Sequence, residues 1–153
     1  MPTLIPRDSF PAYVGLEIEP TEWLQIDQQR IDTFAECTLD RQFIHVDPEA
    51  ARKTPFGGTI AHGFLSLSLL SYFAEQLQIA IDGVQMGVNY GLDKVRFINP
   101  VKVDSRVRVR AKILDIQEKK PAQYQIKLEA TMEIEGEEKP ALIAEWLFMQ
   151  FTG

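Results

Sequence analysis

The 153-residue chain has one cysteine, two histidines and no long apolar run. A single cysteine, Cys37, excludes an internal disulfide and is typical of a reducing compartment, so we expect a cytoplasmic protein. No apolar stretch approaches the length of about eighteen residues that a membrane span needs, and the proline-containing N-terminus lacks the apolar core of a signal peptide. We therefore expect no association with a membrane.

Basic charge is also scarce, since the formal net charge is −6. Such a balance gives no electrostatic reason to expect nucleic acid as a partner, and an anionic ligand would need a local basic patch. The only basic row is Arg106, Arg108 and Arg110 on one face of a predicted strand; we expect a solvated face there, with a phosphate site as the alternative. The sequence has no metal-ligand spacing, no glycine pattern of a nucleotide site and no serine nucleophile elbow, so we expect neither a metal nor a cofactor.

The first half of the chain predicts helices. The length of the whole chain suits one domain, residues 1–153. We expect an irregular lead-in over residues 1–20 and then a short strand near Leu24. Asp27 is a good N-cap for a helix over residues 28–38, in whose last turn we expect Cys37 to be buried. A loop over residues 39–47 and a short helix from Pro48 follow. Residues 61–79 are apolar on nearly every side, which predicts a long buried helix.

From Val84 onward the apolar residues alternate with polar ones, which is typical of strands. The alternation covers four segments, near residues 84–92, 107–113, 124–134 and 141–151. Four consecutive strands joined by short turns predict an antiparallel meander with one apolar face. A long buried helix followed by such a sheet predicts an α+β fold, and the open sheet edges favour a dimer.

Both histidines, His45 and His62, lie in the stretch from Asp40 to Ser71. Asp40 and His45 are five residues apart on a predicted loop, so both side chains could reach one water molecule. A carboxylate and an imidazole of different basicity could then divide the roles of base and acid. The alternative is that Asp40 caps a turn and His45 is an ordinary surface or core residue.

A glycine-rich loop precedes the long predicted helix. A helix that begins near Gly63 would direct unpaired N–H groups at a ligand, such as a thioester oxygen on which negative charge develops. A plain loop-to-helix junction is the alternative, and we expect His62 to fix this loop. Ser71 needs a hydrogen-bond partner, either the helix backbone or the catalytic carboxylate. We expect Ser66 to lie off the pocket.

These residues resemble the MaoC-like dehydratase family, which includes the R-specific enoyl-CoA hydratases. The stretch FIHVDPEAARKTPFGGTIAHGFLSLSLLS looks like the subgroup around nodulation protein N, and the likeness continues more weakly through VNYGLDKVRFINPVKVDSRVRV. The resemblance implies a hot-dog fold, in which an antiparallel sheet wraps a long helix. It also implies that Asp40 and His45 flank the water that adds to a 2-enoyl-CoA, that the Gly63 N–H binds the thioester oxygen, and that Ser71 orients Asp40. Where the family usually has Asn-Pro between the catalytic pair, this chain has Arg41-Gln42-Phe43.

The resemblance thus implies reversible hydration of 2-enoyl-CoA to (R)-3-hydroxyacyl-CoA by a homodimer or a dimer of dimers, with an acyl-CoA substrate and no cofactor. Two other functions stay open. A hot-dog thioesterase usually needs a carboxylate on or beside the long helix, and this helix has no acid before Glu75. The second alternative is a module that binds acyl-CoA or an acyl carrier without turnover.

Overall fold

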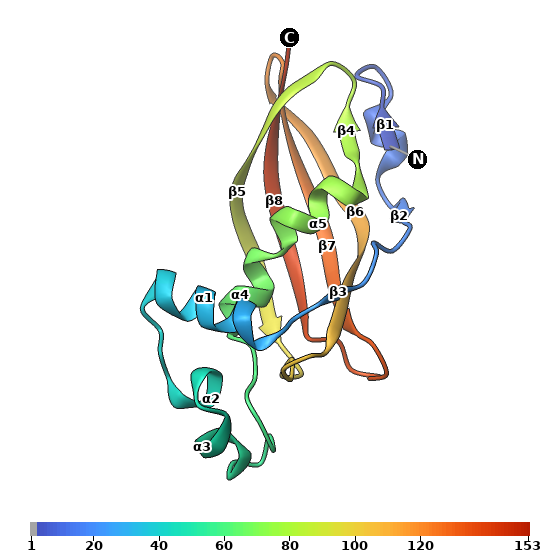
Figure 1. Ribbon diagram of the computed structural model, residues 1–153. Coiled ribbons are helices and arrows are strands. Elements are labelled where there is room, and N and C mark those ends of the chain that lie inside the picture. The colour runs from blue at the N-terminus through green and yellow to red at the C-terminus, as the bar shows by residue number, and fades with distance from the viewer. Residues whose placement is uncertain (1–2) are drawn as a thin grey trace.

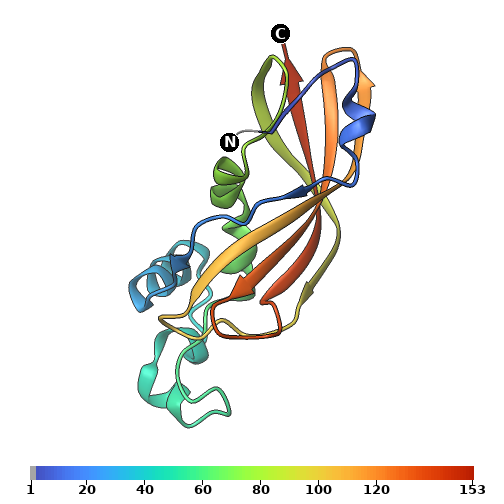
Figure 2. The same ribbon diagram turned by 90° about the vertical axis from the view of Figure 1, so that its right-hand side faces the viewer.

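The computed structural model describes residues 3–153, which form a curved antiparallel sheet with helices on one face (Figures 1 and 2). The six-stranded sheet has the order β2-β6-β7-β8-β5, with β3 also paired to β6. Its strands are β2 (Glu17–Ile18), β3 (Leu24–Gln25), β5 (Val84–Phe97), β6 (Arg106–Lys120), β7 (Gln123–Ile134) and β8 (Leu142–Thr152). A small parallel pair, β1 (Thr3–Ile5) and β4 (Ile79–Ile81), lies beside it.

Two helices cross the concave face of the sheet, and three more gather beyond one end of it (Figure 1). The crossing helices are α4 (Gly63–Ser68) and α5 (Leu70–Leu77), and the others are α1 (Gln28–Thr38), α2 (Phe43–Val46) and α3 (Pro48–Arg52). A 3-10 turn, η1 (Phe10–Tyr13), lies in the lead-in, which also contains β1 and β2 and is therefore more ordered than expected. This architecture is α+β, as expected.

Local signals set the helix ends. The Asp27 carboxylate accepts a hydrogen bond from the Arg30 N–H at 2.9 Å, which confirms the predicted N-cap of α1. Leu39 ends α1 in the left-handed region at φ 65°, where glycine is the favoured residue. Asp47 caps α3 through the Ala50 N–H at 3.1 Å, and Pro48 occupies its first turn, where its missing N–H costs nothing.

The alternation predicted for β6 and β7 is confirmed. The inner-face residues of these strands are buried and form the core with Phe73 of α5. On the outer face Arg108 and Arg110 both pair with Glu133 of β7, and Arg108 also lies over the Trp23 ring. The predicted solvated face is thus a row of exposed and half-exposed ion pairs.

The long predicted helix is divided into two, and it is not buried on every side. Leu69 separates α4 from α5, where its N–H is shared between the Leu65 and Ser66 carbonyls. Ser68 Oγ donates to the Phe64 carbonyl at 2.6 Å, and such back-bonding weakens the helical ladder. Phe64 and Tyr72 are 68% and 46% exposed, because the sheet of this chain covers only one side of the helices.

Four further expectations are wrong. The strands do not form a simple meander, because β5 pairs with β8 and residues 98–105 then cross to β6 at the other side of the sheet. The predicted loop 39–47 contains the one-turn helix α2. Cys37 is exposed, since α1 buries only Ile31 and Ala35. Ser66 is buried and lines a cavity with Gly63. Among residues 3–153, no helix is long and apolar enough to cross a membrane.

Candidate active site

Three predicted site residues come together where α1, α2 and the segment leading into α4 meet. One ligand-type atom from each of Asp40, His45 and His62 lies within 4.8 Å of the other two. Asp40 is exposed, whereas His45 and His62 are 6% and 3% exposed. The site therefore combines a carboxylate at the surface with two buried imidazoles.

His45 lies in the last turn of α2, and its Nδ1 is 2.7 Å from the Ile60 carbonyl oxygen. A carbonyl can only accept, so this contact places the proton on Nδ1 and leaves a lone pair on Nε2. Burial is the largest influence and lowers the pKa of His45 below its ordinary value. The Ile60 bond raises that pKa, His62 lowers it further, and Asp40 raises it. His45 is thus prepared as a neutral base.

His62 precedes α4 and stacks on His45, with ring centroids 3.8 Å apart and an angle of 22° between the planes. Its Nε2 is 2.9 Å from the Asp40 carbonyl oxygen, so by the same argument Nε2 carries the proton. Phe34 of α1 packs against the ring at 4.9 Å. Among residues 3–153 the buried Nδ1 has no hydrogen-bond partner. His62 therefore contacts both His45 and Asp40 while its own side chain stays buried.

The cluster has the residue types of a metal site but not the orientation. Both imidazoles donate one N–H to a backbone carbonyl, as metal-ligating histidines usually do. However, lone pairs lie in the ring planes, and two nearly parallel stacked planes do not converge on one ion. The stacking therefore disfavours chelation of one ion by both imidazoles.

The loop that carries Asp40 is held by contacts other than the family's Asn-Pro. Arg41 pairs with Glu36 of α1, with Nε–Oε1 2.7 Å and Nη2–Oε2 3.0 Å. The Asp40 carboxylate accepts the Gln42 N–H at 3.4 Å. From α1, Gln28 Nε2 donates to the His45 carbonyl at 2.7 Å. These contacts tie the loop to α1.

Gly63 begins α4 beside the ring of Phe97 on β5. A Cβ at this position would lie 3.1 Å from two ring carbons of Phe97, closer than ordinary contact. Gly63, His45 and Ser66 line one cavity of about 280 Å³ with Phe97. The buried imidazole and the start of α4 therefore share one space, and bulk at residue 63 would close it.

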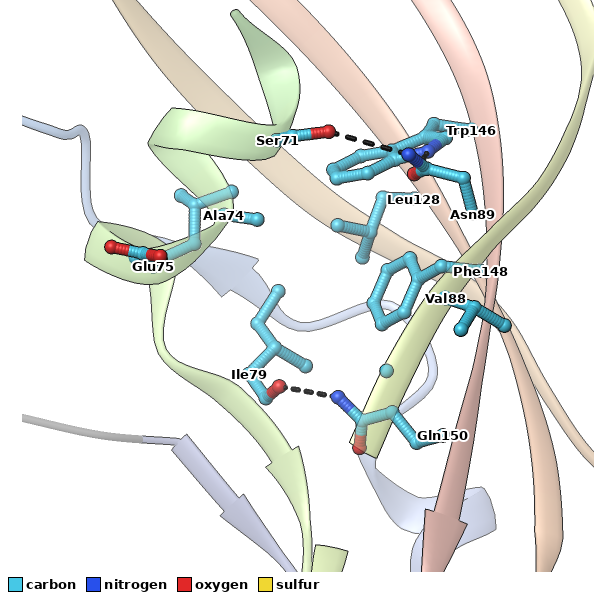
Figure 3. A pocket seen from close by; sticks show the side chains of 12 residues that line it. Ser71, Ala74, Glu75, Ile79, Val88, Asn89, Leu128, Trp146, Phe148 and Gln150 are labelled. Carbon is cyan, nitrogen blue, oxygen red and sulfur yellow. Dashed lines mark hydrogen bonds between the residues drawn. The ribbon is translucent and has the colours of Figure 1, made fainter. Parts of the chain in front are cut away.

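Ser71 lies elsewhere, in the first turn of α5, and the structure does not join it to Asp40. Its Oγ accepts a hydrogen bond from Asn89 Nδ2 at 3.3 Å, and Trp146 Nε1 donates to Asn89 Oδ1 at 3.0 Å (Figure 3). Within residues 3–153, no hydrogen bond links Ser71 to the Asp40 carboxylate. Ser71 belongs to a polar contact between α5 and the sheet.

Several residues that shape the site were not found from the sequence. Gln28 and Phe34 contact the site residues from α1, and Asn89 and Phe97 contact them from β5, so all four lie outside the stretch 40–71. Phe34 and Phe97 read as ordinary apolar positions of a helix and a strand. Asn89 occupies a polar position of the alternation predicted from Val84 onward, so it gave no local signal.

Comparison with known proteins identifies the family. A family model described as MaoC like domain matches residues 9–135. Nodulation protein N of Rhizobium leguminosarum bv. viciae is 50% identical over 138 residues, which cover 90% of this chain and 86% of the relative. 3-Hydroxyacyl-thioester dehydratase Z of Mycobacterium tuberculosis H37Rv is 42% identical over 134 residues and covers 88% of both chains.

Solved structures agree on the fold. An Archaeoglobus protein described as a monoamine oxidase regulatory protein gives a TM-score of 0.77 at 25% identity, covering 92% of this chain and 91% of that one. An (R)-hydratase from A. caviae gives a TM-score of 0.72 at 24% identity, covering 88% and 94%. With the family match over most of its length, the chain belongs to the MaoC-like dehydratase family and has the hot-dog fold.

Proposed function

We propose that this protein reversibly hydrates a 2-enoyl-CoA to the (R)-3-hydroxyacyl-CoA, with Asp40 and His45 as the catalytic pair. One observation carries the proposal: His45 is buried with its proton fixed on Nδ1, and the carboxylate of the exposed residue Asp40 lies close to it. A neutral imidazole next to a carboxylate is a combination that can take a proton from water and return it.

In the proposed reaction one water adds across the double bond. The lone pair of His45 Nε2 accepts a proton as the water oxygen bonds to the β-carbon, and the Asp40 carboxylate orients the water by accepting its other O–H. The imidazolium then returns the proton to the α-carbon, so that His45 ends neutral. Dehydration is the same path reversed.

Negative charge moves onto the thioester oxygen while the β-carbon is attacked. We propose that the Gly63 N–H, which begins α4 at the cavity shared with His45, donates to that oxygen. Such a donor acts more strongly on the enolate than on the ground state, so it should raise turnover. We place His62 in a supporting role, because it stacks on His45 and donates to the Asp40 carbonyl.

The relatives support a thioester substrate. The name 3-hydroxyacyl-thioester dehydratase states this reaction class for the Mycobacterium relative, which is 42% identical. Water and a CoA thioester are sufficient for the chemistry above, so the proposal includes no cofactor. Ser71 remains proposed as a supporting residue, acting through its contact with Asn89 rather than by direct contact with Asp40.

We also propose a homodimer formed through β5. This strand pairs only with β8 and ends the sheet order, so one of its edges is free within the part of the chain described. Its exposed side chains include Met86, Val88, Tyr90 and Leu92. A free edge with apolar side chains is a template for pairing with a second copy.

The test is a kinetic assay with crotonyl-CoA that follows both loss of the enoyl absorbance and release of free thiol. Loss of absorbance without thiol, and formation of the (R)-product, supports the hydratase. Thiol release would identify a thioesterase. Binding of crotonyl-CoA without either change would leave a non-catalytic acyl-CoA module and overturn the proposal.

A further inference from the structure

The side-chain amide of Gln28, the first residue of α1, links two segments that flank His45. Its Nε2 donates to the His45 carbonyl at 2.7 Å and to Asp32 Oδ1 at 2.9 Å. Its Oε1 accepts a hydrogen bond from Thr59 Oγ1 at 2.5 Å. A carbonyl can only accept, so the contact with His45 identifies which end of the amide is the nitrogen. Both N–H groups and the oxygen of this amide are therefore engaged.

These bonds are part of a closed set around the imidazole. His45 Nδ1 donates to the Ile60 carbonyl at 2.7 Å, and the Ile60 N–H donates to the Ile44 carbonyl at 3.0 Å. Ile60 follows Thr59 in the chain, and the Thr59 hydroxyl returns to Gln28. We call the bonds among Gln28, His45, Thr59 and Ile60 the His45 network. Through it Gln28 contacts the backbone of His45 directly and, by way of Thr59, the segment that fixes its ring.

The turn before β6 anchors both Gln28 and Thr59. The Val103 N–H donates to the Thr59 carbonyl at 3.0 Å. The Asp104 N–H donates at 2.7 Å to the carbonyl of Ile26, which is 1% exposed and lies two residues before Gln28. Thr59 is 2% exposed, so its hydroxyl needs a hydrogen-bond partner within the protein. Gln28 and Thr59 are therefore held in place from the same side of the fold.

The helix that carries His45 depends on contacts from outside itself. α2 has four residues, and a helix this short is not stable alone. Gln42 at its N-cap makes no side-chain capping bond. The carbonyls of its last turn lack partners within the helix, and Gln28 supplies a partner for the carbonyl of His45. The direction of the His45 ring is therefore set by the His45 network rather than by α2.

We infer that Gln28 and Thr59 are positioning residues of the proposed hydration, which hold the Nε2 lone pair of His45 in place to take a proton from water. The inference rests on the proposed function. The network fixes the Nδ1–H tautomer and the place of α2 together, so loss of one bond lets the imidazole turn and its proton exchange between the two nitrogens. A displacement of about 1 Å in a reacting group can lower a rate about 10²-fold. Both residues should therefore act on kcat through His45.

The first test compares kcat and KM for crotonyl-CoA in the wild type, Gln28→Met and Gln28→Glu. Methionine keeps the length of the side chain without its hydrogen bonds, and glutamate keeps an oxygen for Thr59 but offers no N–H to the His45 carbonyl. Both variants should lower kcat by about tenfold or more and change KM by less than about threefold. Gln29→Met is the control, because it makes the same change at the next, exposed position of α1. It should leave both constants unchanged.

A pair of changes at Thr59 separates the hydroxyl from the bulk of the side chain. Thr59→Val keeps the shape and removes the hydroxyl, so it should lower kcat as Gln28→Met does. Thr59→Ser keeps the hydroxyl and should recover most of that loss. Equal losses in the two variants would mean that the bond to Gln28 is not what acts on His45, and they would overturn the role given to Thr59.

Nitrogen NMR of the two imidazoles reports where their protons lie without any substrate. The wild type should show His45 protonated on Nδ1 and His62 protonated on Nε2, because each of these nitrogens faces a carbonyl. In Gln28→Met and Thr59→Val, His45 should show a mixture of both tautomers while His62 keeps its own. A change that only lowered the stability of the fold would leave the tautomer of His45 in the folded protein as it is.

Activity and NMR together separate this inference from the proposed function. If the wild type hydrates crotonyl-CoA and the Gln28 and Thr59 variants keep its kcat, the inference is wrong and the function stands. A fall in kcat with an unchanged His45 tautomer would also overturn the inference, because the loss would then act elsewhere. If the wild type hydrates no enoyl-CoA but the tautomer changes in the variants, the proposed function fails and the His45 network is retained as the support of this imidazole.

Discussion

Strands β7 and β5 belong to the same sheet, and both carry apolar residues at alternating positions, yet they differ in what covers them. In β7 every second residue is buried, and Met132 is 0% exposed. In β5 Met86 is 54% exposed and Tyr90 is 66% exposed. The reason is position: β7 lies between β6 and β8 under the helices, whereas β5 ends the sheet order and has one neighbouring strand.

The difference separates two functions of apolar surface. Side chains of β7 stabilise the fold, because they are removed from water within this chain. Side chains of β5 remain available to a ligand or to a second copy, since nothing in residues 3–153 covers them. Large apolar surface that a fold leaves uncovered marks an interaction site. Changes on the exposed surface of β5 should therefore affect association or ligand binding, and changes in β7 should affect stability.

The largest effect should come from the proposed catalytic pair. Asp40→Asn and His45→Gln should each lower the kcat of crotonyl-CoA hydration by about 10²- to 10⁴-fold, because the acid–base pair acts as a unit. Circular dichroism should show that both variants stay folded. Near-normal turnover in either variant would remove that residue from the catalytic pair.

A methionine pair tests the stability side of the comparison. Met132→Ala in β7 should lower the free energy of unfolding by about 2–5 kcal/mol, since it leaves a cavity in a fully buried site. Met86→Ala in β5 removes the same atoms from a position that is exposed in the single chain, so at a protein concentration where the chain is monomeric it should cost about 0.5 kcal/mol or less. Urea unfolding measures both. Equal losses would mean that β5 is as fully covered as β7.

A charge on β5 should weaken the proposed dimer. Tyr90→Lys should reduce the association constant by about tenfold or more, because a desolvated ammonium in an interface lacks a partner. The control is Leu4→Lys, an exposed position of β1 away from β5. Light scattering over a concentration series reports the result. A dimer that tolerates Tyr90→Lys but not Leu4→Lys would move the interface away from β5.

Activity should extend to lower pH than an ordinary imidazole would allow. Because burial lowers the pKa of His45, the base should stay neutral below pH values near 6.5, the ordinary imidazole value. Just below pH 6.5 the unfolded chain binds more protons at His45 than the folded protein does. The contribution of neutral His45 to stability is therefore complete above pH 6.5 and is lost as the pH falls toward the lowered pKa. His62→Gln removes one cause of the shift and should move the acid limb of kcat/KM to higher pH. If the acid limb of the kcat/KM profile does not move in His62→Gln, His62 only holds the loop and does not influence the pKa of His45.

The smallest effect should come from the strained residue before Asp40. Leu39 has φ 65°, and this conformation costs a residue with a Cβ about 1–2 kcal/mol. Glycine avoids that cost, but glycine loses more backbone entropy on folding, which cancels part of the gain. Leu39→Gly should therefore raise the free energy of unfolding by up to about 1 kcal/mol. The control is Cys37→Gly, also exposed but inside α1, which should lower it. A loss at Leu39 comparable to that at Cys37 would show that the leucine side chain contributes packing that outweighs the strain.

Much of the local structure followed from the sequence. The helix 28–38, its Asp27 cap and the buried face of β7 each depend on neighbouring residues or on a repeating pattern, and all are confirmed. The resemblance selected Asp40, His45 and Gly63, and the structure brings Asp40 and His45 together with His62; their catalytic roles remain proposals.

The tertiary structure alone decided the rest. The stacking of His45 on His62, the pairing of β5 with β8 and the hydrogen bonds of Asn89 to Ser71 and Trp146 join segments distant in sequence. Alternation in β5 looked like that in β7, because periodicity reports which residues share a face and not what covers that face. Caps and alternation act over a few residues, so the sequence determined them by itself. Coverage, stacking and these long-range hydrogen bonds depend on where the whole chain places its elements, so only the folded molecule determined those.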